Sequence, residues 1–415
     1  MADAPIIIIG AGQAGLQAAA SLRQDGYTGG IVLIGDEPGL PYQRPPLSKG
    51  YLKDGNAERL LLKSADFFAK NAITLITHTA VTKIDRIART VLLSDGQALA
   101  YSHLILALGA QNRRPPLAGL DLNGVHDLRT LADAETLRGA IAASANIVVI
   151  GGGFIGLEVA ATARAHGASV TVLEASARVM SRAVSPAISD YFHAAHADDG
   201  IELMLDAMAQ RIVASEPGHA NAVELKGGKR IDTDLVLIST GVAANTNIAV
   251  LAGLDVNDGI RVNAHLVTND PHISAIGDCA SFPFGPDLRH IRLESVQNAV
   301  DQAKCVARRL TGHTEAYKKV PWFWSDQGPH KLQMAGLSVG ADHCVARGSF
   351  DEHKLVVCAF TAGALVGVET VNAPGVHMAS RKLLERDAPV SLSELQAGDF
   401  DLTALARSLK SSPAP

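Results

Sequence analysis

Short apolar runs rich in isoleucine and valine recur along the chain, and alanine- and leucine-rich stretches separate them. The first runs are Ile6–Ile9, Ile31–Ile34, Ile147–Ile150 and Val170–Leu173. Ile6–Ile9 and Ile147–Ile150 are too short and too β-branched for helices, and their uninterrupted apolar character predicts strands buried on both faces of a parallel sheet. Ile31–Ile34 and Val170–Leu173 are the expected second strands of the two units. The stretches 16–22 and 157–165 each follow one of these runs and predict helices. The pattern therefore predicts an α/β fold with two βαβ units.

A glycine-rich turn with the spacing G-x-G-x-x-G joins strand to helix in both units. The glycines are Gly10, Gly12 and Gly15 in the first turn, and Gly151, Gly153 and Gly156 in the second. The first glycine of such a turn allows the tight bend, the second lets the backbone approach a pyrophosphate, and the third lets the helix pack closely on the strand. One such match can arise by chance in any glycine-rich loop. Two matches, each between a strand and a helix, predict a chain that holds two dinucleotides at once.

An acidic residue follows the second strand of each unit and is a candidate for binding a ribose. Glu174 lies about twenty residues past the second turn, where a carboxylate accepts hydrogen bonds from a ribose 2′-hydroxyl and repels a 2′-phosphate. This favours NAD over NADP, although Arg178 is close enough in sequence to meet a phosphate. Asp36 is the corresponding acid in the first unit. The competing interpretation is that both acids are solvated strand ends.

Changes of pattern predict three domains, two of them Rossmann-like. Arg113–Pro116 interrupts the first α/β stretch, and the apolar run 235–240 ends at Gly241. We expect a first, discontinuous dinucleotide-binding domain over 1–114 and 244–320, a second over 115–243, and an α+β domain over 321–415. In the last of these, alternating residues at 353–360 and 364–369 predict an antiparallel pair, and 381–386 predicts a closing helix.

Composition narrows the class of protein. The 415 residues carry a net charge of only −5, which gives no overall field for nucleic acid. No apolar run reaches the roughly 18 residues needed to span a bilayer, and no export signal precedes the first strand, so we expect a cytoplasmic protein with no membrane partner. The four cysteines are Cys279, Cys305, Cys344 and Cys358. They form no C-x-x-C pair and no cluster with histidine, so we expect no metal site.

A rigid polar segment, Pro45-Pro46-Leu47-Ser48-Lys49, lies between the two glycine turns. A simple nucleotide-binding domain would need no such segment at this place. With this segment, the chain resembles the NADH-dependent ferredoxin reductases of bacterial oxygenase systems, which are flavoproteins of the glutathione-reductase type. The segments that carry the resemblance are Gly10–Gly15, Pro45–Lys49, Leu128–Thr130, Gly151–Glu158, Gly277–Ala280, Glu294–Val296 and Pro321–Gln327. They span almost the whole chain in the order that the family has.

The resemblance assigns FAD to the first turn and NADH to the second. The FAD contacts that it implies are Gly10, Gly12, Ala14, Gly15, Asp36, Lys49, Val81, Arg129, Asp278, Val296 and Trp324. The NADH contacts are Gly151, Gly153, Ile155, Gly156, Glu174 and Gly241. The resemblance also implies that Lys49 lies by the reactive nitrogen of the flavin and pairs with Glu158. Without the resemblance, the sequence indicates only an ordinary surface lysine at Lys49 and an acid on the face of a helix at Glu158.

Trp322 and Trp324 are the only tryptophans in the chain. Composition alone favours core packing or an interface for them. The resemblance implies that Trp324 lies at the flavin edge where the electron acceptor docks. We therefore expect Lys49, Glu158 and Trp324 to carry the catalytic function.

The resemblance also implies the acceptor, a two-iron two-sulfur ferredoxin that serves a haem-thiolate monooxygenase. A local basic patch would attract it, with Arg289, Arg292, Lys304 and Lys331 as candidates. Gln333 departs from the family pattern, because lysine occupies that place in a relative. We expect a monomer or a weak homodimer.

Two other functions stay open: the reductase of a Rieske dioxygenase system, and a non-catalytic NADH-sensing flavoprotein that resembles apoptosis-inducing factor. A disulfide reductase is disfavoured, because it would need a redox cysteine pair where this chain has Pro45–Lys49.

Overall fold

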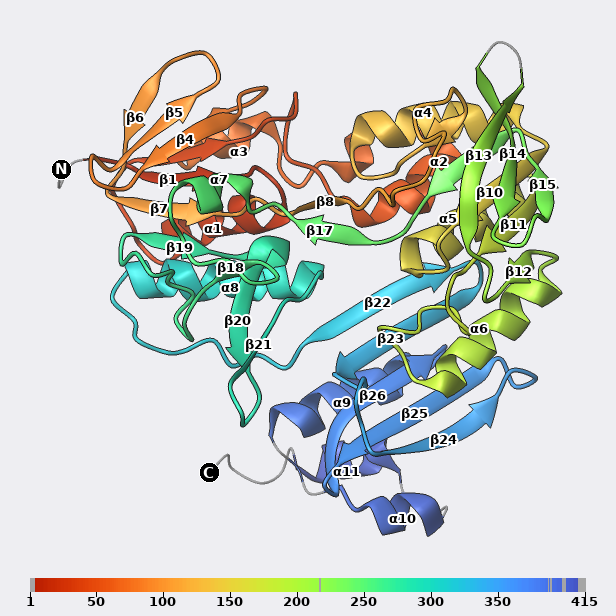
Figure 1. The fold of residues 1–415 in the computed structure, drawn as a ribbon. Coiled ribbons are helices and arrows are strands. Elements are labelled where there is room, and N and C mark those ends of the chain that lie inside the picture. Colours follow the sequence, from red (N-terminus) through yellow and green to blue (C-terminus); the bar gives the residue numbers. More distant parts are fainter. Residues whose placement is uncertain (1–3, 216–217, 387, 389, 398–400, 410–415) are drawn as a thin grey trace. The chain divides into compact units, whose positions relative to one another are not determined.

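The computed structural model describes residues 4–215, 218–386, 388, 390–397 and 401–409. The chain forms two compact units (Figure 1), and each is built from three segments. Unit 1 comprises residues 1–43, 57–111 and 242–319, and unit 2 comprises residues 44–56, 112–241 and 320–415. The segment that carries Lys49 thus belongs to the same unit as the second glycine turn. The boundaries of the three expected domains stay predictions.

Unit 1 is built on a five-stranded parallel sheet with the order β19-β7-β1-β2-β3. Its strands are β1 (Ile6–Ile9), β2 (Ile31–Ile34), β3 (Ile73–Ile76), β7 (His103–Leu106) and β19 (Ile273–Ala275). All four residues of β1 are buried, as the apolar run predicts for a central strand. The helices α1 (Gln13–Gln24) and α8 (Val296–Leu310) pack against each other. The first predicted βαβ unit is therefore present.

Smaller elements complete unit 1. They are the antiparallel strands β4 (Val81–Asp85), β5 (Thr90–Leu93) and β6 (Ala98–Ala100), the sheet of β18 (Ile260–Arg261), β20 (Ala280–Phe284) and β21 (Arg289–Ile291), and the helices η2 (Glu58–Leu60), α3 (Ala65–Lys70), α7 (Asn247–Leu251) and η3 (Gly277–Cys279). The strands β8 (Ala110–Asn112) and β17 (Val242–Ala244) pair in a two-stranded sheet. They lie where the chain leaves unit 1 after residue 111 and where it returns at residue 242.

Unit 2 contains a second parallel sheet with the order β12-β11-β10-β16-β9. Its strands are β9 (Val125–His126), β10 (Asn146–Ile150), β11 (Ser169–Leu173), β12 (Glu202–Met204) and β16 (Leu235–Ile238). The helices of this part are η1 (Pro45–Ser48), α2 (Gly50–Asp54), α4 (Leu131–Ala143), α5 (Phe154–Ala165) and α6 (Pro186–Asp198). An antiparallel sheet of β13 (Ala209–Ser215), β14 (His219–Leu225) and β15 (Arg230–Asp232) follows β12 in the chain.

The C-terminal part of unit 2, blue in Figure 1, is a five-stranded antiparallel sheet with the order β22-β23-β26-β25-β24. Its strands are β22 (Trp322–Gln327), β23 (His330–Gly336), β24 (His343–Ser349), β25 (Lys354–Thr361) and β26 (Ala364–Val371). The helix α9 (Pro374–Glu385) packs on β23 and β26. The predicted antiparallel pair is present as β25 and β26. The predicted closing helix is the last part of α9, and α10 (Leu392–Ala397) and α11 (Leu402–Ser408) follow it.

The fold class is confirmed: an α/β protein with two parallel sheets of the dinucleotide-binding type and an antiparallel C-terminal part. Within the described parts of the chain, none of the helices has both the length and the apolar character to cross a membrane.

Candidate functional site

The two glycine turns have the geometry that a pyrophosphate requires. Gly10 and Gly151 have φ values of +105° and +112°, and a Cβ on either would lie 2.1 Å or 2.3 Å from a backbone carbonyl oxygen. Only glycine tolerates both conditions. A Cβ on Gly12 or Gly153 would meet nothing within 4 Å, so the chain itself leaves this backbone open. The open space is a cradle that fits the approach of a phosphate group in both turns.

The third glycine of each turn allows the helix to pack closely. A Cβ on Gly15 would lie 1.9 Å from the carbonyl oxygen of Gly10, and a Cβ on Gly156 would lie 2.2 Å from that of Gly151. Ala14 and Ile155 lie in the first turns of α1 and α5.

The helices after the two turns begin without a side-chain cap. Neither Gly12 nor Gly153 caps its helix, and the first turns of α1 and α5 contain no acidic residue. In contrast, Thr130 caps α4 and Ser295 caps α8 through side-chain oxygens. Uncapped N–H groups at a helix N-terminus are donors for an anion. Both turns therefore fit the phosphates of a dinucleotide.

The carboxylate of Glu174 lies at the second turn, as its place after β11 predicts. It accepts hydrogen bonds from the backbone N–H groups of Gly152 and Ser176, each at 2.8 Å. Arg178 is held elsewhere, because its guanidinium donates to Ser189 Oγ at 2.8 Å and to two backbone carbonyls. Glu174 thus lies beside the second turn, whereas the guanidinium of Arg178 is hydrogen-bonded to other parts of the protein.

Lys49 and Glu158 form an ion pair. The Nζ atom of Lys49 lies 2.7 Å from Oε1 of Glu158, and the two side chains are 19% and 5% exposed. The 3₁₀ helix η1 ends directly before Lys49, and α5 begins at the second glycine turn. The expected contact between a lysine and an acid more than a hundred residues apart is therefore present, in a largely water-free environment.

Two serines that the sequence did not single out also bind the Glu158 carboxylate. Ser48 Oγ donates to Oε2 at 2.5 Å, and Ser325 Oγ donates to Oε1 at 2.6 Å. Both serines are in the segments that carry the family resemblance. Serine is common on every protein surface, so their residue type alone could not identify them as partners of a buried acid.

Trp324 lies in β22 and is half-buried, directly opposite Gln333 of β23. Its ring centroid lies 5.6 Å from that of Trp322, and the guanidinium of Arg381 lies 4.5 Å above the Trp322 ring. Residues opposite each other in an antiparallel pair share one face of the sheet. Gln333, the departure from the family pattern, is therefore a neighbour of Trp324.

The other expected FAD contacts of unit 1 lie at the ends of its elements. Asp36 is exposed two residues past β2, Val81 begins β4, and Val296 begins α8. Asp278 lies in η3, next to Gly277, where an added Cβ would be 3.1 Å from Ala14. This places Asp278 beside the first turn.

The remaining expected contacts lie in unit 2. Arg129 directly precedes the cap of α4, and its carbonyl oxygen accepts a hydrogen bond from Arg44 at 2.6 Å. Gly241, with a φ of +92°, lies beyond β16, and its carbonyl oxygen accepts from the backbone N–H of Arg113 at 2.9 Å.

Of the four expected docking cations, Arg292 is unsuitable. Its side chain is 9% exposed and forms ion pairs with Asp258 at 3.1 Å and with Glu294 at 2.6 Å, so its charge is already neutralised. Arg289, Lys304 and Lys331 are exposed.

The environments of the four cysteines disfavour the thiolate form. All four are free, and burial raises the pKa of Cys279 to about 11 and that of Cys358 to about 12. Burial also raises the pKa values of Cys305 and Cys344. Because the thiolate is the reactive form, these shifts make all four thiols less reactive than an ordinary cysteine at neutral pH.

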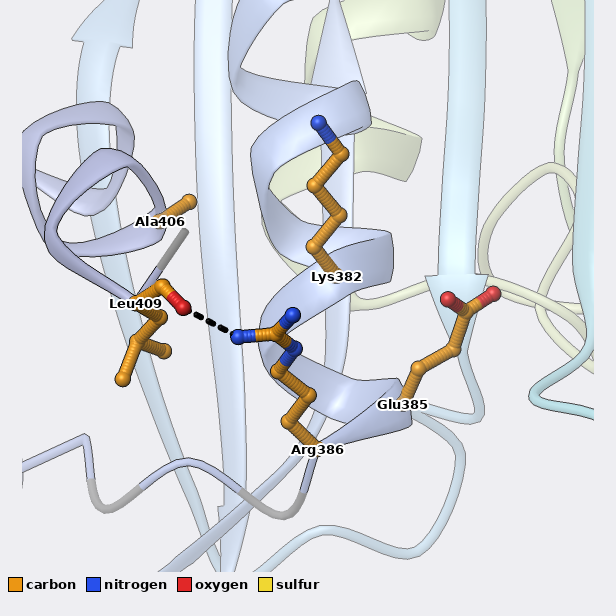
Figure 2. A pocket seen from close by; sticks show the side chains of 5 residues that line it. All are labelled: Lys382, Glu385, Arg386, Ala406 and Leu409. Carbon is orange, nitrogen blue, oxygen red and sulfur yellow. Dashed lines mark hydrogen bonds between the residues drawn. The ribbon is translucent and has the colours of Figure 1, made fainter. Parts of the chain in front are cut away.

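In the part of the chain that the structure describes, no group of three or more His, Cys, Asp or Glu residues could hold a metal ion. A pocket of about 240 Å³ lies beside the packed helices α9 and α11 (Figure 2) and is lined by Lys382, Glu385, Arg386, Ala406 and Leu409. Arg386 donates to the carbonyl oxygen of Leu409 there, which makes it a packing feature between helices.

Comparison with known proteins agrees with this geometry. Residues 4–303 match the family described as pyridine nucleotide-disulphide oxidoreductase, and residues 322–406 match the reductase C-terminal family. The chain is 50% identical over 404 residues to rhodocoxin reductase of Rhodococcus erythropolis, which covers 97% of this chain and 94% of that protein.

Two crystal structures are closely similar over nearly the whole chain. One is the ferredoxin reductase for the CYP199A2 system from Rhodopseudomonas palustris, with 47% identity, a TM-score of 0.94 and coverage of 97% of this chain and 99% of that one. The other is the covalent putidaredoxin reductase–putidaredoxin complex, with 38% identity, a TM-score of 0.95 and coverage of 99% and 100%.

The chain therefore belongs to the pyridine nucleotide-disulphide oxidoreductase family, whose members bind FAD and NAD(P)H. Within that family it is one of the ferredoxin reductases of bacterial oxygenase systems, and its class of activity is that of a ferredoxin–NAD(P)⁺ oxidoreductase.

Proposed function

We propose that this enzyme transfers electrons from NADH through FAD to a two-iron two-sulfur ferredoxin that serves a haem-thiolate monooxygenase. FAD, when bound, supplies the step that links a two-electron donor to a one-electron acceptor. The observation that carries the proposal is the pair of open, uncapped glycine turns in a chain whose relatives reduce ferredoxins. The relatives with the highest identity reported above belong to monooxygenase systems, which favours a haem-thiolate oxygenase over a Rieske dioxygenase.

The residues of the first turn would bind the FAD pyrophosphate, and those of the second turn that of NADH. Asp278 would accept a hydrogen bond from the flavin's ribityl chain, because it directly follows Gly277, where an added Cβ would lie 3.1 Å from Ala14 of the first turn. Lys49 would place a cation beside the flavin ring and so favour its reduced, anionic form. Glu158 offsets the cost of removing that cation from water.

NADH is the proposed donor because of Glu174. Its carboxylate lies at the turn through hydrogen bonds to two backbone N–H groups, so it would meet the ribose there and repel a 2′-phosphate.

Replacing Glu174 with alanine is expected to reduce the preference for NADH over NADPH by about tenfold or more, since a hydrogen bond to a charged group contributes about 1.5–3 kcal/mol. The measurement is kcat/KM for both nucleotides. Glu202→Ala, which removes an exposed acid from the neighbouring strand β12, is the matched control and should keep the preference. An unchanged preference in Glu174→Ala would show that another residue selects the nucleotide.

The experiment that tests the proposed function separates the two half-reactions. Trp324→Ala should slow electron delivery to ferredoxin by about tenfold or more, because a well-packed contact aromatic contributes 2 kcal/mol or more. Reduction of the flavin by NADH should change much less. Both rates are measured anaerobically by stopped-flow absorbance, and Trp324→Phe, which keeps an aromatic ring, serves as the control. Equal losses in the two half-reactions would contradict a docking-edge role for Trp324.

A further inference from the structure

The strand β22 presents two different faces. Side chains alternate along a strand, so Phe323, Ser325 and Gln327 point to one side, and Trp322, Trp324 and Asp326 to the other. The Phe323 ring lies 4.7 Å from that of Phe154, the first residue of α5. Ser325 contacts Glu158 in the same helix. One face of β22 therefore packs on the helix that begins at the second glycine turn, while the opposite face carries both tryptophans.

Gln327 extends this contact to the other side of the turn. Its Nε2 atom lies 3.4 Å from Sδ of Met180, and the backbone N–H of Met180 donates to the carbonyl oxygen of Gly152 at 2.9 Å. Gln327 Oε1 also lies 2.8 Å from Nε2 of His196 in α6. The strand is thus bound to both flanks of the turn.

The side chains between His196 and Glu158 form a hydrogen-bond chain that runs in one direction. Burial lowers the pKa of His196, which keeps the imidazole neutral, and its Nε2–H donates to Gln327 Oε1. Gln327 Nε2 donates to Ser325 Oγ at 3.2 Å, and Ser325 Oγ donates to Glu158. Each group therefore donates towards the carboxylate, an arrangement in which successive bonds strengthen one another.

The residues of this hydrogen-bond chain are buried, so the loss of one donor affects the Glu158 carboxylate. Ser325 is 0% exposed, Gln327 is 1% exposed and His196 is 2% exposed. Water cannot readily replace a donor that is removed there, and a buried carboxylate without its full set of donors is costly. Glu158 Oε1 is shared by Ser325 and Lys49, so the position of the serine hydroxyl helps to fix the position of the lysine.

We infer that Ser325, supported by Gln327 and His196, is a positioning residue that fixes the Glu158 carboxylate and through it Lys49. The same contacts tie the tryptophan strand to the NADH turn. The inference rests on the proposed function, because it takes the pair of Lys49 and Glu158 to act on the flavin.

The test combines structure with a double-mutant cycle on the holoenzyme. In crystals of Ser325→Ala, the distance of 2.7 Å between Lys49 Nζ and Glu158 Oε1 should be lost, whereas Ser325→Thr should keep it. The rate of flavin reduction by NADH should fall about tenfold or more in Ser325→Ala, as expected for loss of a hydrogen bond to a charged group, and should stay within about threefold of wild type in Ser325→Thr. In a Glu158→Ala background, Ser325→Ala should have little further effect.

The inference would be overturned if the Lys49–Glu158 distance were unchanged in Ser325→Ala, or if Ser325→Thr reduced its flavin as slowly as Ser325→Ala. It would also be overturned if Ser325→Ala slowed flavin reduction equally in the wild-type and Glu158→Ala backgrounds. Asp326→Asn, on the opposite face of β22, is the control for a change in the strand and should leave this rate unaltered. Lys49→Met separates the two proposals. If it slows flavin reduction and Ser325→Ala does not, only the positioning role fails. If neither variant slows it, the proposed role of Lys49 fails.

Discussion

The Gly12→Ala variant is expected to fold and to lose FAD, whereas Gly153→Ala is expected to keep FAD and to lose productive binding of NADH. Both glycines have φ values near −80° in an extended conformation that alanine adopts, and an added Cβ meets no atom of the chain within 4 Å. The methyl group would instead occupy the space through which a pyrophosphate approaches the backbone. We expect each affinity to fall by about a hundredfold or more, because two hydrogen bonds to a charged group would be lost.

FAD content after purification and the KM for NADH are the measurements for these two variants. Gly139→Ala provides the control, since Gly139 is an exposed residue of α4 with open space around it, and alanine there should keep both cofactors. The assignment of the turns would be wrong if Gly153→Ala lost FAD, or if Gly12→Ala kept FAD and bound NADH poorly.

The Lys49→Met variant is expected to reduce its flavin with NADH about a hundredfold more slowly, the typical effect of removing one group that stabilises developing charge in a water-free site. Methionine keeps most of the length of the side chain and removes the cation. It also leaves Glu158 as a buried anion with only two serine donors. The rate is measured by anaerobic stopped-flow at saturating NADH.

Lys49→Arg is the matched control for this change, because it keeps a positive charge beside Glu158. It should retain much more activity than Lys49→Met. A Lys49→Met enzyme that reduces its flavin within about twofold of the wild-type rate would remove Lys49 from the mechanism.

The parts of the fold that repeat a simple pattern could be predicted from the sequence. The runs Ile6–Ile9, Ile31–Ile34, Ile147–Ile150 and Val170–Leu173 form the largely buried parts of β1, β2, β10 and β11, because short, mostly β-branched runs fit the interior of a sheet covered on both faces. The glycine turns were predictable for a similar reason: a positive φ and a close carbonyl contact exclude every other residue type at Gly10 and Gly151.

The polar contacts of the candidate site could not be predicted from pattern. Ser48 and Ser325 approach Glu158 only because η1, α5 and β22 meet in the folded chain, and separations of 110 and 167 residues carry no local periodicity. The role of Arg292 also depended on a tertiary contact, since Asp258, one of the two acids that pair with it, is 34 residues away in the sequence. The family resemblance pointed to the segments that contain Ser48, Glu158 and Ser325, but not to the hydrogen bonds between these residues.

The stoichiometry of electron transfer in the wild-type enzyme tests whether it links NADH to a ferredoxin. The FAD-loaded protein is mixed anaerobically with a limiting amount of NADH and an excess of an oxidised ferredoxin, using the partners of the rhodocoxin and putidaredoxin reductases as acceptors. Because NADH supplies two electrons and a two-iron two-sulfur centre accepts one, we expect two ferredoxins to be reduced for each NADH consumed. Rapid bleaching of the flavin by NADH, followed by no reduction of either ferredoxin, would contradict this expectation and favour an NADH-sensing flavoprotein.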